Sequence, residues 1–262
     1  MNDMLVDTHA HLYFEHFEPD LPEVIERAAE AGVERILNIG VDVASSRRCV
    51  ELAESYSGLY AAVGVHPNDA ATFSETTLAE LRELTRHPKV VALGEIGLDF
   101  YRDRCPTAQQ EKAFRAQIAL AKELRLPIVI HNREAGRQIV DVLRSEGVAG
   151  LTGVFHCFSE DVALAEEVLS FGFYISFTGN LTFRKSELPR VAERVPLQRL
   201  LLETDSPFLS PEPKRGRRNE PAHVVYLARK LAEIKRTTFE KVVRETTLNA
   251  ERLFGMGSAE ME

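Results

Sequence analysis

The sequence predicts an α/β fold in which eight parallel strands, each followed by a helix, close into a barrel. The chain has 262 residues, close to the roughly 250 residues of a typical eight-unit barrel. Short apolar runs alternate with longer amphipathic segments almost from end to end, which is typical of repeated strand–helix units. The apolar runs are continuous, as expected for parallel strands that are covered on both faces. We therefore expect a single (β/α)8 TIM-barrel domain over residues 1–262, with an extra C-terminal helix.

Eight apolar runs have the length and the β-branched composition of buried strands. The run Val-Val-Ala-Leu at 90–93 and the run Pro-Ile-Val-Ile at 127–130 are examples. In chain order, the expected strands are Met4–Asp7, Arg35–Ile39, Leu59–Val65, Val90–Glu95, Ile128–His131, Gly153–His156, Phe173–Phe177 and Leu200–Glu203.

Amphipathic segments of helical length separate these strands. Gly32, Gly147 and Gly172 each follow such a segment and precede a strand, where a left-handed helix C-cap favours glycine. After the eighth strand we expect one helix that completes the barrel and one that is added to it. The expected helices are Leu21–Ala31, Ser45–Ser57, Thr77–Arg86, Thr107–Leu124, Ala135–Ser145, Val162–Ser170, Ser186–Val195, Ala222–Ile234 and Phe239–Leu253.

An open, doubly wound sheet is the alternative arrangement of eight parallel strands. No Gly-x-Gly-x-x-Gly turn follows the first strand, which removes the usual dinucleotide-binding form of that sheet. No linker, low-complexity tract or internal repeat divides the chain, so a single domain is expected.

The composition is that of a soluble globular protein, and we expect a cytoplasmic location without a membrane partner. No apolar run reaches the roughly 18 residues that a membrane span needs, and Met1–Leu5 lacks the features of a signal peptide. The three cysteines are widely spaced and odd in number, which suits a reducing compartment. Cys49 and Cys157 are expected to be buried, and Cys105, in a polar loop, to be exposed.

The net charge of −8 argues against a broad electrostatic surface for duplex nucleic acid, because that binding depends on lysine and arginine. It does not exclude a nuclease, since bound divalent cations would add positive charge at the site itself. Nothing in the composition implies an obligate protein partner.

The first candidate site residues are His9 and His11, directly after the first apolar run. Side chains at positions i and i+2 of a strand point to the same face, so both imidazoles can converge on one point. Imidazole suits zinc and other divalent transition metals. Taken alone, the pair is equally typical of a surface coincidence.

Further candidate ligands recur at the C-terminal ends of expected strands, where the active site of such a barrel is built. They are Glu95, His131, His156 and Asp205. With about 30 residues for each strand–helix unit, they fall on strands four, five, six and eight. All of these side chains therefore point to the same rim of the barrel as the histidine pair.

Four histidines and two carboxylates exceed the needs of one catalytic zinc, which usually takes three protein ligands and a water. Two metal ions are implied. A carboxylate has two oxygens, which makes Glu95 the natural bridge between them. We expect the remaining ligands to divide between the two ions, with His9, His11 and Asp205 on one and His131 and His156 on the other.

A series of short motifs extends over almost the whole chain. They are Asp7–Leu12, Gly64–Pro67, Gly94–Asp99, His131–Ala135, Phe155–Ser159, Thr178–Phe183, Glu203–Leu209, Arg218–Pro221 and Asn249–Phe254. In these motifs the chain resembles the TatD family of metal-dependent hydrolases, within the amidohydrolase-like superfamily. The resemblance implies a metal-dependent barrel with deoxyribonuclease activity, often from the 3′ end of DNA, and it supports the six ligands. Glu160 stands where relatives often have glycine, beside the site.

Hydrolysis of a phosphodiester needs a better nucleophile than water and a way to offset the charge of the phosphate. Two divalent ions supply both, because a metal-bound water ionises near pH 7 and paired ions stabilise the attacking and leaving oxygens. We expect Asp205 to take or orient the proton of that water, and Glu95 to take part as the bridging carboxylate.

The expected substrate contacts are His66, Arg133, Arg215 and Arg218. His66 ends the third strand at the same rim. A contact with a phosphate or support of a metal ligand is as open for this residue as a purely structural role. An arginine fork suits bidentate phosphate binding, although Arg133 also fits an ion pair with Glu134. Arg215 and Arg218 belong to the one concentrated basic run, at 214–218, after the eighth strand.

Several contacts around these residues are also expected from the sequence. Asn219 and Glu220 are expected to fix the basic loop or to cap the following helix. Tyr101 and Phe158 are candidates for stacking a base, although aromatic residues near a rim usually pack.

The leading expectation is therefore a deoxyribonuclease with two divalent ions, acting on DNA that is single-stranded or at its 3′ ends. A hydrolase of a small phosphoester, amide or lactone on the same metal centre is the alternative, because fold does not fix substrate. A non-catalytic metal-binding protein is a third. Zinc, manganese, cobalt or nickel fit the histidines, whereas magnesium prefers oxygen ligands.

Overall fold

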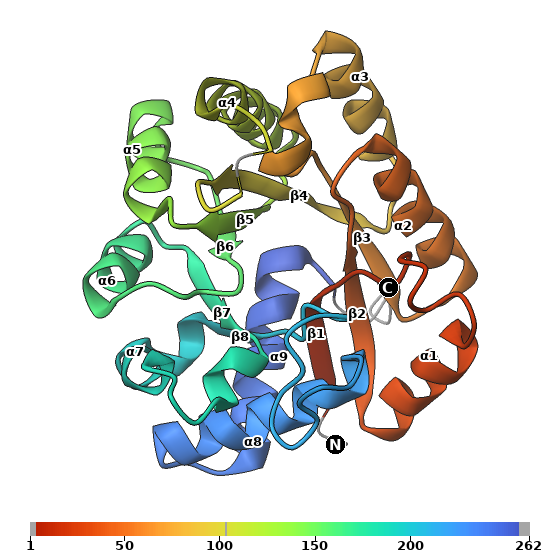
Figure 1. The fold of residues 1–262 in the computed structure, drawn as a ribbon, viewed down its shortest axis with the longest axis vertical. Coiled ribbons are helices and arrows are strands. Elements are labelled where there is room, and N and C mark those ends of the chain that lie inside the picture. Colours follow the sequence, from red (N-terminus) through yellow and green to blue (C-terminus); the bar gives the residue numbers. More distant parts are fainter. Residues whose placement is uncertain (1–3, 103, 257–262) are drawn as a thin grey trace, which may run out of the picture.

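The computed structural model describes residues 4–102 and 104–256. The two ends of the expected 1–262 domain lie outside these residues. So do Met1 to Asp3, which belong to the segment without signal-peptide features. Eight parallel strands form one sheet in the order β1 to β8, and this sheet curves into a barrel with helices around it (Figure 1). The strands are β1 Leu5–Ala10, β2 Val33–Ile39, β3 Leu59–Val63, β4 Val90–Asp99, β5 Ile128–Arg133, β6 Gly153–Phe155, β7 Tyr174–Phe177 and β8 Leu200–Leu202.

The expected (β/α)8 barrel is confirmed, including the added C-terminal helix. Glycine ends three helices as expected, with positive φ angles of 82° at Gly32, 75° at Gly147 and 83° at Gly172. The helices are α1 Leu21–Glu30, α2 Val43–Ser55, α3 Glu75–Leu84, α4 Thr107–Leu124, α5 Gly136–Glu146, α6 Val162–Ser170, α7 Leu188–Arg194, α8 Val224–Lys235 and α9 Phe239–Phe254.

Strand β4 is four residues longer than the sequence predicts. We expected it to end at Glu95, but it continues to Asp99 because its last residues pair with β5, from Ile96 opposite Ile130 to Asp99 opposite Arg133. Glu95 therefore projects from within a strand, and the strand continues beyond it to Asp99. β1 is also longer than expected and includes His9.

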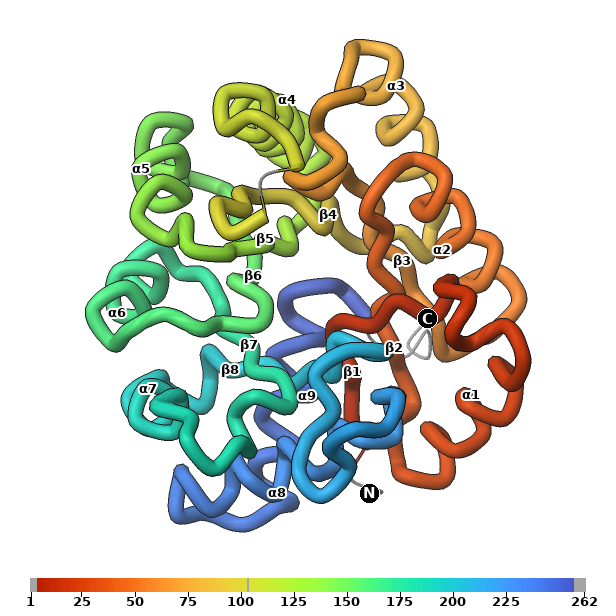
Figure 2. Tube along the Cα trace, viewed as in Figure 1, coloured from red at the N-terminus to blue at the C-terminus, as the bar shows by residue number. Residues whose placement is uncertain are grey.

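The barrel closes between β1 and β8 through a short joint. A parallel bridge pairs Ala10 with Ser206, and backbone N–H groups of Asp205 and His11 donate to the carbonyls of His9 and Ser206, both at 2.8 Å. In Figure 2 the segment after β8 accordingly lies beside the N-terminal segment at the barrel mouth. The first and last parts of the chain thus meet at the rim that carries the candidate ligands.

The core has two parts. A larger cluster fills the space between the strands and the surrounding helices. A second cluster combines residues from all eight strands with α9, among them Val6, Val91 and Leu201 from strands and Leu253 and Phe254 from the helix. Only the interior of a barrel is reached by all eight strands, so α9 closes the end of the barrel opposite the candidate site.

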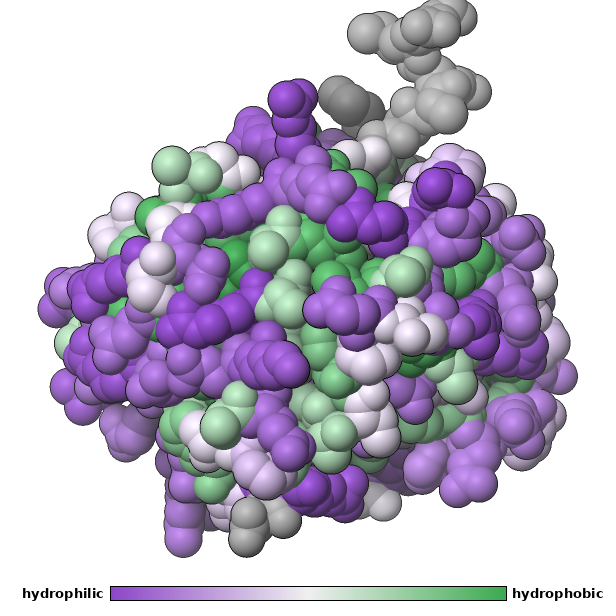
Figure 3. All heavy atoms as spheres, turned by 90° about the horizontal axis from the view of Figure 1, so that it is seen from above, coloured by the Kyte–Doolittle hydropathy of each residue, from purple (hydrophilic) through white to green (hydrophobic). Residues whose placement is uncertain are grey.

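Hydrophilic side chains dominate the flank of the barrel that Figure 3 shows, on the side of α3 and α4, and hydrophobic residues are visible between them. Over residues 4–102 and 104–256, no helix is both long enough and apolar enough to cross a bilayer.

Candidate metal centre

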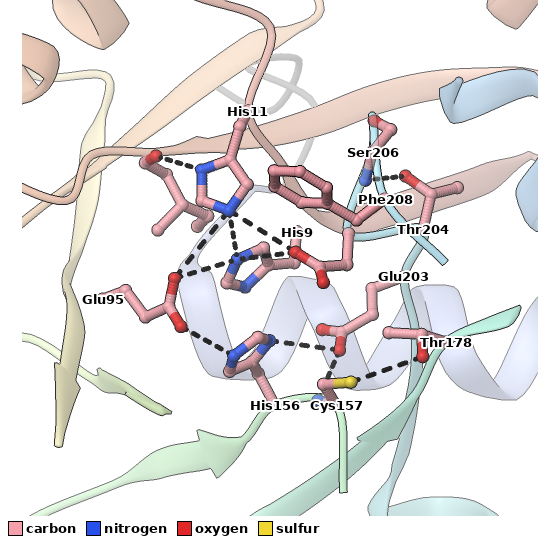
Figure 4. Close-up of polar contacts among 12 residues, drawn as sticks. His9, His11, Glu95, His156, Cys157, Thr178, Glu203, Thr204, Ser206 and Phe208 are labelled. Carbon is pink, nitrogen blue, oxygen red and sulfur yellow. Dashed lines mark hydrogen bonds and ion pairs between the residues drawn. The ribbon is translucent and has the colours of Figure 1, made fainter. Parts of the chain in front are cut away.

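The six ligands expected from the sequence come together at the C-terminal rim of the barrel. The loops that follow the strands carry His11, His156 and Asp205, whereas β1, β4 and β5 themselves carry the other three. Figure 4 labels four of the six, His9, His11, Glu95 and His156, and shows their contacts. Most of the six side chains are almost fully buried, and His131 and Asp205 are the more exposed, at 18% and 14%. These two side chains are therefore the ones that solvent reaches most easily.

A first group is formed by His9, His11 and Asp205 with one oxygen of Glu95. The Nε2 atoms of the two histidines lie 3.1 Å apart. Glu95 Oε2 lies 3.4 Å from His9 and 3.8 Å from His11, and Asp205 Oδ1 lies 3.7 Å and 3.4 Å from them. Four ligand atoms around a tetrahedral zinc are about 3.4 Å apart, so the spacing and donor types of this group fit a divalent ion.

A second group lies on the other oxygen of Glu95. Glu95 Oε1 is 2.6 Å from His131 Nδ1 and 2.8 Å from His156 Nε2. These are direct hydrogen-bond distances, and the donors are again two imidazoles and a carboxylate, a set that suits a transition metal. Glu95 therefore stands between both groups, with one oxygen in each, as expected for a bridge.

The charges of this cluster are strongly coupled. Burial opposes ionisation of Glu95, but His156 and His131 outweigh it and hold the Glu95 pKa well below its usual value. Burial likewise lowers the pKa of His156, yet the two carboxylates of Glu95 and Glu203 raise it well above the usual value. Burial, reinforced by the neighbouring His156, lowers the pKa of His9. The site thus stabilises cationic charge beside Glu95, which is what a bound divalent ion would supply.

Two of the histidines are hydrogen-bonded through their other ring nitrogen. His11 Nδ1 lies 2.9 Å from the Ile39 carbonyl, and His131 Nε2 lies 3.2 Å from Asp99 Oδ2. Such contacts fix the orientation of a ligand imidazole and raise its basicity. The Nδ1 atoms of His9 and His156 are buried and make no hydrogen bond. The Nδ1 atom of His156 lies at an ion-pair distance of 3.4 Å from Glu203 Oε1.

Asp99 and Glu203 are the site residues that sequence reasoning missed. Both carboxylates are almost fully buried. The spacing in the sequence could have indicated both residues. Asp99 is four residues after Glu95 in one strand and so shares its face. Glu203 is two residues before Asp205. Asp99 also accepts backbone N–H groups of Tyr101 and Arg102, at 3.0 and 2.8 Å, which anchors the loop after β4.

The ring of His66 is held so that a protonated nitrogen is directed toward the site. Its Nδ1 accepts the backbone N–H of Asn68 at 3.0 Å, so in the neutral ring the proton sits on Nε2. That nitrogen lies 3.7 Å from Glu95 Oε1. Burial and the nearby His131 lower the His66 pKa to about 3, which keeps the ring neutral. An imidazole with its Nε2 protonated donates a hydrogen bond and does not bind a metal through that atom.

The three arginines expected to contact substrate are placed differently. The guanidinium of Arg133 lies 4.7 Å from the Tyr101 ring, and that of Arg215 lies 3.8 Å from the Phe183 ring. Both side chains are exposed. Arg218 is instead engaged by Asp20, through two hydrogen bonds of 2.7 Å. It therefore ties the loop after β8 to the segment before α1.

Asn219 fixes the same loop, in agreement with expectation. Its Nδ2 donates to the carbonyls of Thr204 at 2.9 Å and of Phe208 at 2.7 Å. Glu220 precedes the short 3-10 helix Pro221–His223 at its N-cap position but makes no side-chain cap hydrogen bond, and its carboxylate instead accepts Arg27 at 2.7 Å. The loop after β8 is consequently held from both sides.

For Phe158 the packing alternative holds, since the ring is only 1% exposed and packs against Phe177. Two expectations for the cysteines were wrong. Cys105 is buried against Ala70 rather than exposed. Cys157, expected to be buried, is half-buried and directly follows the candidate ligand His156.

A (β/α)8 barrel with paired histidine and carboxylate groups at its C-terminal rim belongs to the class of metal-dependent hydrolases. Comparison with known proteins assigns the family: residues 6–255 match the family described as TatD related DNase. The chain belongs to the TatD family.

Named relatives extend over nearly the full chain. The chain is 49% identical over 252 residues to the uncharacterized metal-dependent hydrolase YabD of Bacillus subtilis, covering 96% of this chain and 99% of that protein. It is 37% identical over 258 residues to the 3′-5′ ssDNA/RNA exonuclease TatD of Edwardsiella piscicida, covering 95% and 99%. The crystal structure of YjjV, a TatD homolog from Escherichia coli, superimposes with a TM-score of 0.93 at 32% identity, covering 98% and 100%.

Proposed function

We propose that this TatD-family hydrolase is a deoxyribonuclease that cleaves phosphodiester bonds from the 3′ end of single-stranded DNA. The observation that carries the proposal is the position of Glu95, whose two oxygens each face a separate group of imidazoles. Two divalent ions, each held by one oxygen of the same carboxylate, would suit in-line displacement at a phosphate. The exonuclease name of the Edwardsiella relative supports the choice of substrate.

The residues that would hold the ions are the six at the rim. We assign His9, His11, Asp205 and Glu95 Oε2 to one ion, and His131, His156 and Glu95 Oε1 to the other. When bound, two divalent ions supply a more acidic water and positive charge that offsets the anionic phosphate. The imidazole-rich donor set favours zinc, manganese, cobalt or nickel over magnesium.

Asp205 is the residue we assign to proton transfer. Its carboxylate is more exposed than that of Glu95, at 14% against 5%, so it is the acidic group that a water in the mouth reaches first. Burial opposes its ionisation, but His11 and His9 lower its pKa, so it is ionised and able to accept a proton near neutral pH.

His66 and two arginines are assigned to the substrate. The Nε2–H of His66 points into the site and would donate to an oxygen of the scissile phosphate. Arg133 and Arg215, exposed on opposite parts of the rim, would contact phosphates further along the strand through their guanidinium groups. Arg218 is left out of this assignment because Asp20 occupies its guanidinium.

The test is cleavage by chelator-stripped protein of single- and double-stranded DNA labelled at the 5′ end. Zinc, manganese, magnesium, cobalt and nickel are added back separately. We expect no cleavage without metal, and a ladder shortened from the 3′ end of the single strand with at least one ion. Glu95→Gln should abolish cleavage, whereas Glu212→Gln, in the exposed loop after β8, should not. Absence of cleavage with every ion would overturn the DNA substrate and favour a small phosphoester.

A further inference from the structure

The large hydrophobic side chains left exposed by the fold gather at the candidate site. Among the residues that the structure describes, they are Phe100 at 40%, Tyr101 at 60% and Phe208 at 47%. Phe100 and Tyr101 directly follow β4, and Phe208 lies in the loop after β8. Exposed aromatic rings confined to the rim of a site indicate a ligand with an apolar face.

Phe208 and Phe14 form an aromatic ledge beside the first metal-binding group. Their ring centroids are 5.8 Å apart. The Phe14 ring lies 5.3 Å from the His11 ring, and the Phe208 ring lies 6.4 Å from it. Figure 4 shows Phe208 near His11, on the same loop as Ser206. The ledge is therefore within one nucleotide of the atoms that would hold the scissile phosphate.

The backbone that carries the exposed ring of the ledge is held in place. The backbone N–H of Phe208 donates to the Asp205 carbonyl at 2.9 Å, and its own carbonyl accepts Asn219 Nδ2 at 2.7 Å. The backbone of Phe208 is thus fixed relative to a candidate ligand, Asp205, and Phe14 packs against its ring. A preformed surface of this kind binds without the entropic cost of ordering a loop.

The charge around the site narrows the kind of ligand. Phosphate-binding groups lie nearby, because Arg133 stands across the mouth at the end of β5 and Arg215 extends from the loop after β8. In the ring of strands β1 to β8, the ledge at β8 and β1 is opposite β4 and β5. The aromatic ledge and the two arginines together match a ligand in which aromatic and anionic parts alternate. An unpaired nucleotide chain is such a ligand.

We infer that Phe208, supported by Phe14, stacks the base of one of the two nucleotides that flank the scissile phosphate. The inference rests on the proposed nuclease function and deepens it. Stacking on an aromatic ring tolerates every base but needs the base to be unpaired. The ledge therefore selects single strands over duplex DNA without reading the sequence.

The experiment measures how much a base contributes to cleavage. Single-stranded oligonucleotides carry either ordinary nucleotides or a base-free tetrahydrofuran analogue at the terminal or the penultimate 3′ position. At one of these positions, we expect kcat/KM of the wild type to fall about ten- to hundredfold when the base is removed. In Phe208→Ala, the ratio of kcat/KM with the base to kcat/KM without it should approach one. Phe208→Trp should restore the wild-type ratio.

Two further variants separate stacking from stability. Phe208→Leu keeps the apolar contact with Phe14 without an aromatic face, so it should behave as Phe208→Ala. Phe171→Leu changes a half-buried phenylalanine that ends α6, at the far end of the barrel, and should keep the wild-type ratio.

The outcomes distinguish the inference from the function on which it rests. A wild type that cleaves DNA with no dependence on either base overturns the inference and leaves the nuclease function standing. The same holds if Phe208→Ala slows cleavage equally for both oligonucleotides, or retains the wild-type ratio. Failure of the wild type to cleave any oligonucleotide overturns the nuclease function, and the inference with it.

Discussion

The backbone N–H of Asp205 donates to the carbonyl of His9 at 2.8 Å, so the joint that closes the barrel joins two candidate ligands of the same metal ion. Nearby, the Asp7 carboxylate accepts the backbone N–H of Thr204 at 2.9 Å and its hydroxyl at 2.5 Å. The register between the first and last strands is thereby fixed where His9 and Asp205 must meet. The contacts that close the barrel therefore also bring the candidate ligands His9 and Asp205 together.

Asp205→Asn should reduce turnover far more than substrate binding. Asparagine keeps the size and one oxygen of the side chain but cannot accept a proton, so we expect kcat to fall about 10²- to 10⁴-fold with KM changed less than about tenfold. Steady-state cleavage of a 5′-labelled single strand measures both constants. Metal content must be measured in parallel, and intact turnover in a metal-replete variant would exclude Asp205 as the proton acceptor.

Glu203→Gln should weaken metal binding at the position of His156. The Glu203 carboxylate is buried, accepts the backbone N–H of Cys157 at 2.6 Å and lies 3.4 Å from His156 Nδ1. Glutamine can still accept the N–H group but lacks the charge that favours a well-oriented imidazole. We expect affinity for one of two ions to fall about 10- to 100-fold, measured by calorimetric titration of the metal-free protein.

Glu212→Gln is the matched control for that substitution, since Glu212 is an exposed carboxylate of the loop after β8. It should bind metal as the wild type does. If the wild type, Glu203→Gln and Glu212→Gln bind metal with equal affinity, Glu203 serves only to hold the Cys157 backbone.

The order and approximate positions of the strands, and the rim at which the candidate ligands meet, were predictable because two kinds of regularity act together. Periodic apolar runs mark buried parallel strands, and the C-terminal ends of such strands share one rim, so His9, Glu95 and Asp205 can be placed together from spacing alone. The extension of β4 was not predictable in this way. The added residues 96–99 contain a glycine and a carboxylate, and only pairing with β5 makes them a strand.

Contacts between loops far apart in sequence also escaped prediction. The basic residues at 214–218 look equivalent in sequence, yet Arg218 pairs with Asp20 whereas Arg215 lies over Phe183. Nothing local distinguishes them, because the partner of Arg218 is set by how the loop after β8 packs on the start of α1. The exposure of Phe208 is equally a property of the folded rim.

Asp20→Asn should destabilise the protein at neutral pH and have less effect in acid. The hydrogen bonds from Arg218 hold the Asp20 pKa at about 2, below its unfolded value near 3.8. A lowered pKa means that the contribution is complete above about pH 4 and is lost as the pH falls toward 2. Because both side chains are about a third exposed, we expect no more than about 1 kcal/mol.

Urea unfolding of the wild type and Asp20→Asn at about pH 7, 5 and 3 measures this difference in the free energy of unfolding. The difference should be constant between the first two and smaller at the third. A difference that grows on acidification would show that the pKa of Asp20 is not lowered in the folded protein.

Phe254→Ala should destabilise the whole barrel, although residue 254 lies at the end of the last helix. Its ring is buried in the interior cluster that α9 shares with all eight strands, so truncation leaves a cavity where no other element can collapse. We expect the free energy of unfolding to fall by about 3–5 kcal/mol, measured by urea denaturation of the metal-free protein. Arg252→Ala, on the exposed face of the same helix, should change it by less than about 0.5 kcal/mol. A small loss for Phe254→Ala would mean that α9 merely lies against a barrel that is stable without it.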